Sequence, residues 1–172
     1  MLIRPYAPAD ADEVNSVARS AFAQYEGVYK DWDILIRGVG AMASLAEQGE
    51  IIVAEDRYRV VGAVCYCPPT SAPRAEFFER EWPIIRMLVV DPNARGQGIG
   101  RKLTEECIRR AARDGANLIA LHTSPAMQTA LAMYLRMGFT LTRRVPDRFG
   151  VPYGVYTLNL SPTQALASSP SH

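Results

Sequence analysis

The spacing of hydrophobic residues along the chain predicts four amphipathic helices. Apolar positions recur every three to four residues in each of these segments, as they do on the buried face of a helix. The predicted helices cover residues 8–22, 32–48, 100–114 and 126–137. Gly115 and Gly138 directly follow the last two and are suitable C-terminal caps. Gly38 and Gly40 lie inside the second helix and weaken it, by about 1 kcal/mol each relative to alanine.

Shorter runs of apolar and β-branched residues predict seven strands. These runs cover residues 2–4, 50–54, 59–67, 84–90, 118–122, 139–144 and 155–160. The order of elements predicts a mixed α/β fold. Each strand–helix–strand step in the second half of the chain predicts parallel pairing of the two strands that it joins. Residues 68–82 form a long connection, and connections of this length within a compact domain are often functional.

Length and composition favour one soluble domain over residues 1–160. The chain has 172 residues, of which 48% are hydrophobic and 22% charged, and its Ser/Pro/Ala-rich segment 161–172 is expected to be disordered. A net charge of +1 argues against a nucleic-acid partner held by bulk electrostatics. No apolar run is long enough for a membrane span, and residues 1–5 lack the apolar core of a signal peptide. We therefore expect a cytoplasmic protein with no membrane partner.

The cysteine and histidine content predicts neither disulfides nor a metal site. Three cysteines, Cys65, Cys67 and Cys107, show no disulfide spacing, which indicates reduced thiols. The first two share one face of a predicted strand, where buried packing is the favoured interpretation. With only two histidines in the chain, we expect no zinc site and no other metal.

A glycine-rich run at positions 96–100 connects a predicted strand to a predicted helix. Alternating glycines permit positive φ and allow a ligand to approach the main chain, while the helix N-terminus offers unpaired N–H groups. Arg95, Arg101 and Lys102 flank the run. Cations in the first turn oppose the helix dipole, and a bound polyphosphate is a reason for their presence.

Two common phosphate-binding motifs are excluded at this run. The Walker A motif and the dinucleotide fingerprint both require a glycine five residues after Gly96, and Arg101 stands there. A nicotinamide-dependent oxidoreductase is therefore disfavoured.

Residues 84–139 resemble the GNAT superfamily of N-acetyltransferases. The family's central motif, V-x-P-x-x-R/Q-x-x-G-x-G/A, is matched in register by Val90, Pro92, Arg95, Gly98 and Gly100. Its later motif, Y-x-x-x-G-F, is matched by Tyr134, Gly138 and Phe139. The resemblance implies a GNAT-like fold, with a mixed, mostly antiparallel sheet of about seven strands. Four helices would flank this sheet, which would be splayed between its fourth and fifth strands.

The resemblance also implies an acyltransferase that uses acetyl-coenzyme A as its co-substrate. Family members bind the pyrophosphate with the main chain of the glycine-rich run and pair the pantetheine arm with the preceding strand. The residues implied to bind the cofactor are Leu88, Val89, Val90, Arg95, Gly96, Gln97, Gly98, Ile99, Gly100, Arg101 and Lys102. The acetyl group would pass directly to a primary amine of a small molecule or a protein.

By the same resemblance, Tyr134 is the general acid for the leaving thiolate, although it could instead be a packing aromatic residue. The identity of the general base is not determined by the resemblance. Many family members place a glutamate where this chain has Ile84. Glu81 is our candidate for the base, and Glu79, His122 and a water-mediated route are alternatives.

The acceptor and the assembly are not determined by these residues. We expect the acceptor pocket to draw on residues 25–37, 68–82 and 144–155, whose composition is aromatic and weakly basic. Arg86 could contact the substrate or pair with a carboxylate. A homodimer stays an open alternative. The missing glutamate at position 84 favours a second hypothesis, a non-catalytic acetyl-CoA sensor, while Tyr134 argues against it.

Overall fold

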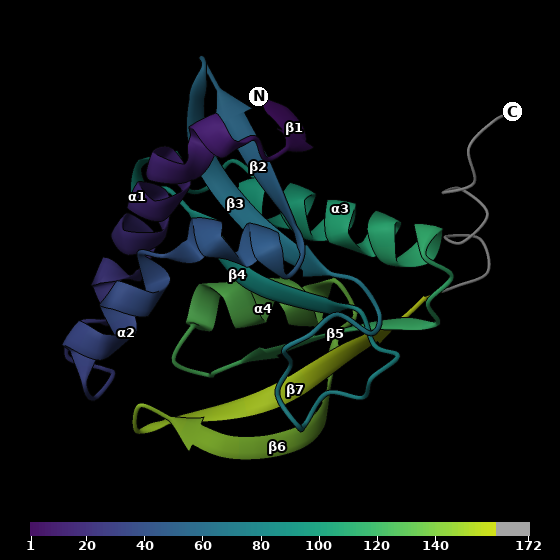
Figure 1. The fold of residues 1–172 in the computed structure, drawn as a ribbon. Coiled ribbons are helices and arrows are strands. Elements are labelled where there is room, and N and C mark those ends of the chain that lie inside the picture. The colour runs from purple at the N-terminus through teal and green to yellow at the C-terminus, as the bar shows by residue number, and fades with distance from the viewer. Residues whose placement is uncertain (161–172) are drawn as a thin grey trace, which may run out of the picture.

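One seven-stranded sheet organises the part of the chain that the computed structural model describes, residues 1–160. The predicted disordered tail at 161–172 lies outside these residues. The strands are β1 (Leu2–Pro5), β2 (Glu50–Asp56), β3 (Arg59–Cys67), β4 (Ile84–Val90), β5 (Leu118–Thr123), β6 (Thr140–Arg148) and β7 (Val151–Asn159). The helices are α1 (Ala11–Phe22), α2 (Trp32–Val39), α3 (Ile99–Arg113) and α4 (Gln128–Arg136). The strand order is β1-β2-β3-β4-β5-β7-β6, in agreement with the predicted sheet (Figure 1).

The two faces of the sheet carry two hydrophobic clusters, because successive side chains of a strand point to opposite sides. Ile51 and Val53 belong to the cluster beneath α1, and their neighbours Ile52 and Ala54 belong to the cluster beneath α3. Figure 1 shows α1 and α2 on one side of the sheet and α3 and α4 on the other. The predicted α/β architecture is thereby confirmed.

The sheet is splayed between β4 and β5, as predicted. These two strands are parallel and share a single pair, Ile84 with Ala120. Beyond Ile84, the edge of β4 that faces β5 has no strand partner. A bulge opposite β3 bends β4 at Met87, whose φ of 56° is unusual for a residue with a side chain. The bulge lies at the point where the two strands separate.

The second predicted parallel pair was wrong. The step through α4 does not place β6 beside β5, because β7 lies between them and is antiparallel to both. Burial explains this order. β7 is buried along much of its length and takes the inner position, whereas β6 is mostly exposed and forms the edge of the sheet. The hairpin is also longer than predicted, and it turns at Phe149 and Gly150 with positive φ at both.

The predicted helix over residues 32–48 is interrupted. Helix α2 ends at Val39, Gly40 is its C-terminal cap, and a 3₁₀ segment follows over Met42–Glu47. The glycines that weaken this helix therefore decide where it stops. Cys65, Cys67 and Cys107 are buried free thiols, as predicted.

Candidate active site

The glycine-rich run forms an open turn in front of α3. Gly96 and Gly98 have φ values of 79° and 74°, and a Cβ atom on either would meet no other atom within 4 Å. Backbone conformation, rather than crowding, therefore requires glycine at both positions. The Lys102 N–H donates to the Gly98 carbonyl at 3.1 Å, which starts the helical hydrogen-bond pattern. The amides that precede Lys102 in the first turn have no acceptor within the helix and can bind an anion.

A cavity of about 390 Å³, which we call the glycine-run pocket, lies over this turn. Its walls come from the free edge of β4, the end of α1 and one side of α4. The predicted cofactor-binding residues that line it are Leu88, Val89, Val90, Arg95, Gly96, Gly98, Ile99, Gly100 and Arg101. The exposed Gln97 and Lys102 are not among the lining residues. The structure therefore brings most of the predicted residues together around one cavity.

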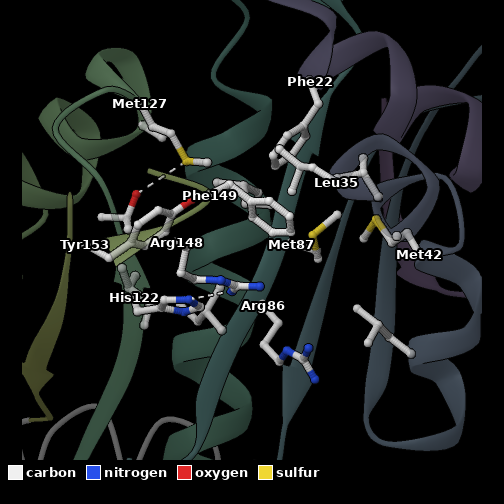
Figure 2. A pocket seen from close by; sticks show the side chains of 18 of the residues that line it. Phe22, Leu35, Met42, Arg86, Met87, His122, Met127, Arg148, Phe149 and Tyr153 are labelled. Carbon is white, nitrogen blue, oxygen red and sulfur yellow. Dashed lines mark hydrogen bonds between the residues drawn. The ribbon is translucent and has the colours of Figure 1, made fainter. Parts of the chain in front are cut away.

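A second cavity of about 450 Å³, the central pocket, adjoins the first. The two cavities share the side chains of Phe22, Leu88, Met127 and Ala130, so they meet where β4 and β5 diverge. Figure 2 shows apolar side chains from α1, α2 and β4 around the central pocket, together with polar side chains from β5 and the β6–β7 hairpin.

Tyr134 lines the central pocket from α4. Its residue is only 5% exposed, and its ring packs against Phe139 at a centroid distance of 5.5 Å. Burial raises the pKa of the Tyr134 phenol, so the hydroxyl keeps its proton at neutral pH. Both roles foreseen for this residue are compatible with its place, since a packed ring can present a protonated hydroxyl to the cavity.

The candidate base residues lie in different places. Glu81 is exposed on the 68–82 loop and lines neither cavity described above. Glu79 is also exposed and forms a 3.2 Å ion pair with Arg143. His122 alone of the three lines the central pocket, and no aspartate or glutamate among residues 1–160 lines it.

His122 is a neutral group in this pocket. Its Nε2 accepts a hydrogen bond from Nη1 of Arg148 at 2.8 Å, because a guanidinium can only donate. The rings of Phe77 and Tyr153 lie 5.3 and 5.1 Å from the imidazole. Burial, followed by the charges of Arg148 and Arg86, lowers the pKa of His122 to about 4. The imidazole is therefore a weak base.

The 68–82 loop forms the wall of a third cavity, the outer pocket, of about 800 Å³. Arg74 holds the loop together by donating to the carbonyl groups of Pro68, Ser71, Glu79 and Trp82. Three residues, Arg86, His122 and Arg148, line both the outer and the central pockets.

Sequence reasoning found some residues of the central pocket and missed others. Arg148, Phe149 and Tyr153 lie on the segment expected to contribute, whereas Trp82 lines none of the three cavities. Phe22 was assigned only to a helix, because the last residue of an apolar stripe looks like any other core residue. The Tyr29 and Tyr153 hydroxyls, 2.5 Å apart, were also unforeseen as a pair, since 124 positions separate them in sequence.

Comparison with known proteins identifies the family. Residues 12–139 match the model of the acetyltransferase (GNAT) family. N-acetyltransferase 8F1 of Rattus norvegicus is 32% identical over 117 residues, which cover 67% of this chain and 51% of the rat protein. The chain thus spans about half the length of this curated relative. It belongs to the GNAT family of acetyltransferases.

Solved structures show the same fold. A ribosomal-protein-alanine N-acetyltransferase from Brucella melitensis has a TM-score of 0.68 at 22% identity and covers 93% of this chain and 100% of its own. The putative acetyltransferase yncA from Salmonella typhimurium, solved with acetyl-CoA, has a TM-score of 0.67 at 21% identity and covers 94% of each chain. No helix within residues 1–160 has the length and apolar character needed to cross a membrane.

Proposed function

We propose that this chain transfers the acetyl group of acetyl-CoA to a primary amine. The observation that carries the proposal is the continuity of the site. An anion-binding turn, the unpaired edge of β4 and a pocket with a protonated tyrosine adjoin one another in that order. Family membership supports acetyl transfer, and the structural relative from Salmonella typhimurium was solved with acetyl-CoA.

The residues of the glycine-run pocket fit a nucleotide-linked thioester. The amides before Lys102 and the charges of Arg95 and Arg101 suit a pyrophosphate. The unpaired edge at Leu88–Val90 suits an extended arm that carries amide groups, because such an arm can pair as an added strand. When bound, acetyl-CoA supplies an acetyl group activated as a thioester.

Two groups of the chain can assist transfer at the junction of the pockets. A main-chain N–H of Leu88–Val90 can donate a hydrogen bond to the carbonyl oxygen on which negative charge develops. The Tyr134 hydroxyl can donate a proton to the departing sulfur, since burial keeps the phenol protonated.

We assign no side chain as the base and propose that water in the central pocket relays the amine's proton to bulk solvent. Glu81 and Glu79 do not line this pocket, and a pKa near 4 makes His122 a poor proton acceptor. Because the imidazole of His122 is neutral, it does not add to the electrostatic repulsion of a protonated amine that enters the pocket. The acceptor must therefore reach the thioester as the free amine.

A thermal melt with acetyl-CoA, with NAD as the control ligand, tests the donor site first. Acetyl-CoA at 100 times its dissociation constant adds about 2.7 kcal/mol, which corresponds to roughly 5–10 °C for a domain of this size. A shift with acetyl-CoA alone supports the proposal, and no shift with a folded sample overturns it. Release of free thiol with a panel of amines then separates an enzyme from a sensor, which would bind acetyl-CoA without turnover.

A further inference from the structure

The central pocket contains two positive charges and no negative one. Arg86 of β4 and Arg148 at the end of β6 both line it. Figure 2 shows the Arg148 guanidinium beside His122 and the Arg86 side chain extending from β4 below it. No aspartate or glutamate of the described chain lines this pocket. Glu76 and Asp147 line only the outer pocket.

Neither arginine has a carboxylate partner within residues 1–160. Arg86 donates to the neutral Oε1 of Gln48 at 3.0 Å, and Arg148 donates to the neutral imidazole of His122 at 2.8 Å. Arg4 and Arg110, by contrast, are paired with carboxylates, Arg4 with Asp10 at 2.8 Å and Arg110 with Glu50 at 2.9 Å. Arg86 is half-buried and Arg148 is exposed, so both guanidinium charges at the central pocket stay available to an anionic ligand.

The remainder of the central pocket is apolar. Phe22, Leu35, Met42, Met87 and Phe149 surround the side away from the two arginines (Figure 2). Methionine side chains adapt to apolar groups of different shape, so this wall suits a hydrophobic substituent more than one particular ring. The pocket thus offers an anion-binding side and an apolar side.

We propose that the acceptor is an amino acid with an apolar side chain, whose carboxylate is held by Arg86 and Arg148. This inference rests on the proposed function. The acetyl carbon forms a bond to the acceptor nitrogen as its bond to sulfur breaks. The sulfur leaves as a thiol with the proton of Tyr134. The proton that the nitrogen loses passes to water, and water restores the Tyr134 hydroxyl, so the reaction is balanced. A polyamine is a poor fit, because its charges would face two guanidinium groups. A protein N-terminus or lysine lacks the neighbouring carboxylate.

Matched acceptors test the proposal directly. Acetyl-CoA-dependent thiol release is measured with L-phenylalanine against L-phenylalaninamide and phenethylamine, and with L-leucine against isoamylamine. We expect kcat/KM to be about 10- to 100-fold higher for each amino acid, because a charge-assisted pair with a guanidinium is lost in the others. Equal or faster turnover of the carboxylate-free amines would overturn this inference while leaving acetyl transfer in place. Binding of acetyl-CoA without thiol release from any amine would overturn the proposed function instead.

Variants then locate the carboxylate site. Arg86→Gln and Arg148→Gln should each reduce the preference for L-phenylalanine over phenethylamine about tenfold, mainly through KM. Arg86→Lys and Arg148→Lys should restore part of it, because they keep the charge and lose the paired donors. Arg144→Gln is the matched control, since this exposed β6 arginine lines none of the three pockets. An unchanged preference in folded Arg86 and Arg148 variants that still bind acetyl-CoA would overturn the assignment.

Discussion

At the scale of single residues, burial determines the protonation states of the site. Tyr134 and His122 are both enclosed among apolar and aromatic side chains, and burial favours the neutral form of each. The tyrosine therefore keeps a proton that it can donate, and the imidazole stays uncharged beside two arginines. Neither state is visible from residue type alone.

Replacing Tyr134 with phenylalanine removes the proposed proton donor and keeps the packed ring. We expect kcat to fall by about 100-fold, at the lower end of the contribution of general acids, while the Kd of acetyl-CoA stays within a few-fold. Steady-state kinetics and calorimetry measure the two quantities. Tyr58→Phe, on an exposed turn, is the control. Unaltered turnover in Tyr134→Phe would leave the residue with a packing role only.

At the scale of elements, two local structures shape the site. The αL residue Gly98 sets the direction in which α3 begins, and this leaves the amides of its first turn open to the glycine-run pocket. Arg74 organises the 68–82 loop around one guanidinium, which suits a segment without regular secondary structure of its own.

Substitution of Gly98 tests the turn before α3. Gly98→Glu introduces a carboxylate at the turn that we propose binds the pyrophosphate, and we expect the Kd of acetyl-CoA to rise by more than 100-fold. Gly98→Asn is the matched control, because asparagine tolerates positive φ and carries no charge. Equal affinities of the two variants, measured by calorimetry, would show that the turn does not hold the pyrophosphate.

Removal of the Arg74 side chain tests the loop. Arg74→Ala deletes hydrogen bonds to four carbonyl groups, so we expect faster proteolysis within 68–82 and a severalfold higher KM for the acceptor. The Kd of acetyl-CoA should not change, since the loop does not line the glycine-run pocket. Arg80→Ala, at an exposed position of the same loop, is the control. A protease pattern shared by both variants would argue against the organising role of Arg74.

At the scale of the whole molecule, acid should destabilise the fold in two steps. Burial lowers the pKa of His122 from 6.5 to about 4, so the unfolded chain binds more protons than the folded one between these values. The hydrogen bonds from Arg4 hold the pKa of the Asp10 carboxyl below its usual value. Protonation of Asp10 therefore continues the loss of folding stability at lower pH. Stability is thus complete above pH 6.5 and decreases as the pH falls.

Thermal melts between pH 3 and pH 8 test this dependence. We expect Tm to be nearly constant above pH 6.5, to fall between pH 6.5 and pH 4, and to fall further below pH 4. His122→Asn should reduce the fall in Tm between pH 6.5 and pH 4, and Asp10→Asn should change Tm only below pH 4. A Tm that drops equally in wild type and His122→Asn above pH 4 would contradict the assignment to His122.

The sequence by itself determined the features that depend on local spacing. Amphipathic periods predicted the helices and strands, and the glycine-rich run predicted an anion-binding turn, because both follow from residues within one turn or one strand. The two motifs at Val90–Gly100 and Tyr134–Phe139 also predicted the GNAT family and the splayed sheet, which the comparisons and the strand pairing confirm.

Only the tertiary structure decided which distant residues meet. The insertion of β7 between β5 and β6 depends on which strand buries more apolar surface, and neither strand contains that information alone. The same packing leaves Glu81 on the exposed loop and brings Arg86 and Arg148 into one pocket. These two arginines are 62 positions apart in sequence. They share a pocket because β4 and the β6–β7 hairpin both line it, a non-local result that spacing along the chain does not predict.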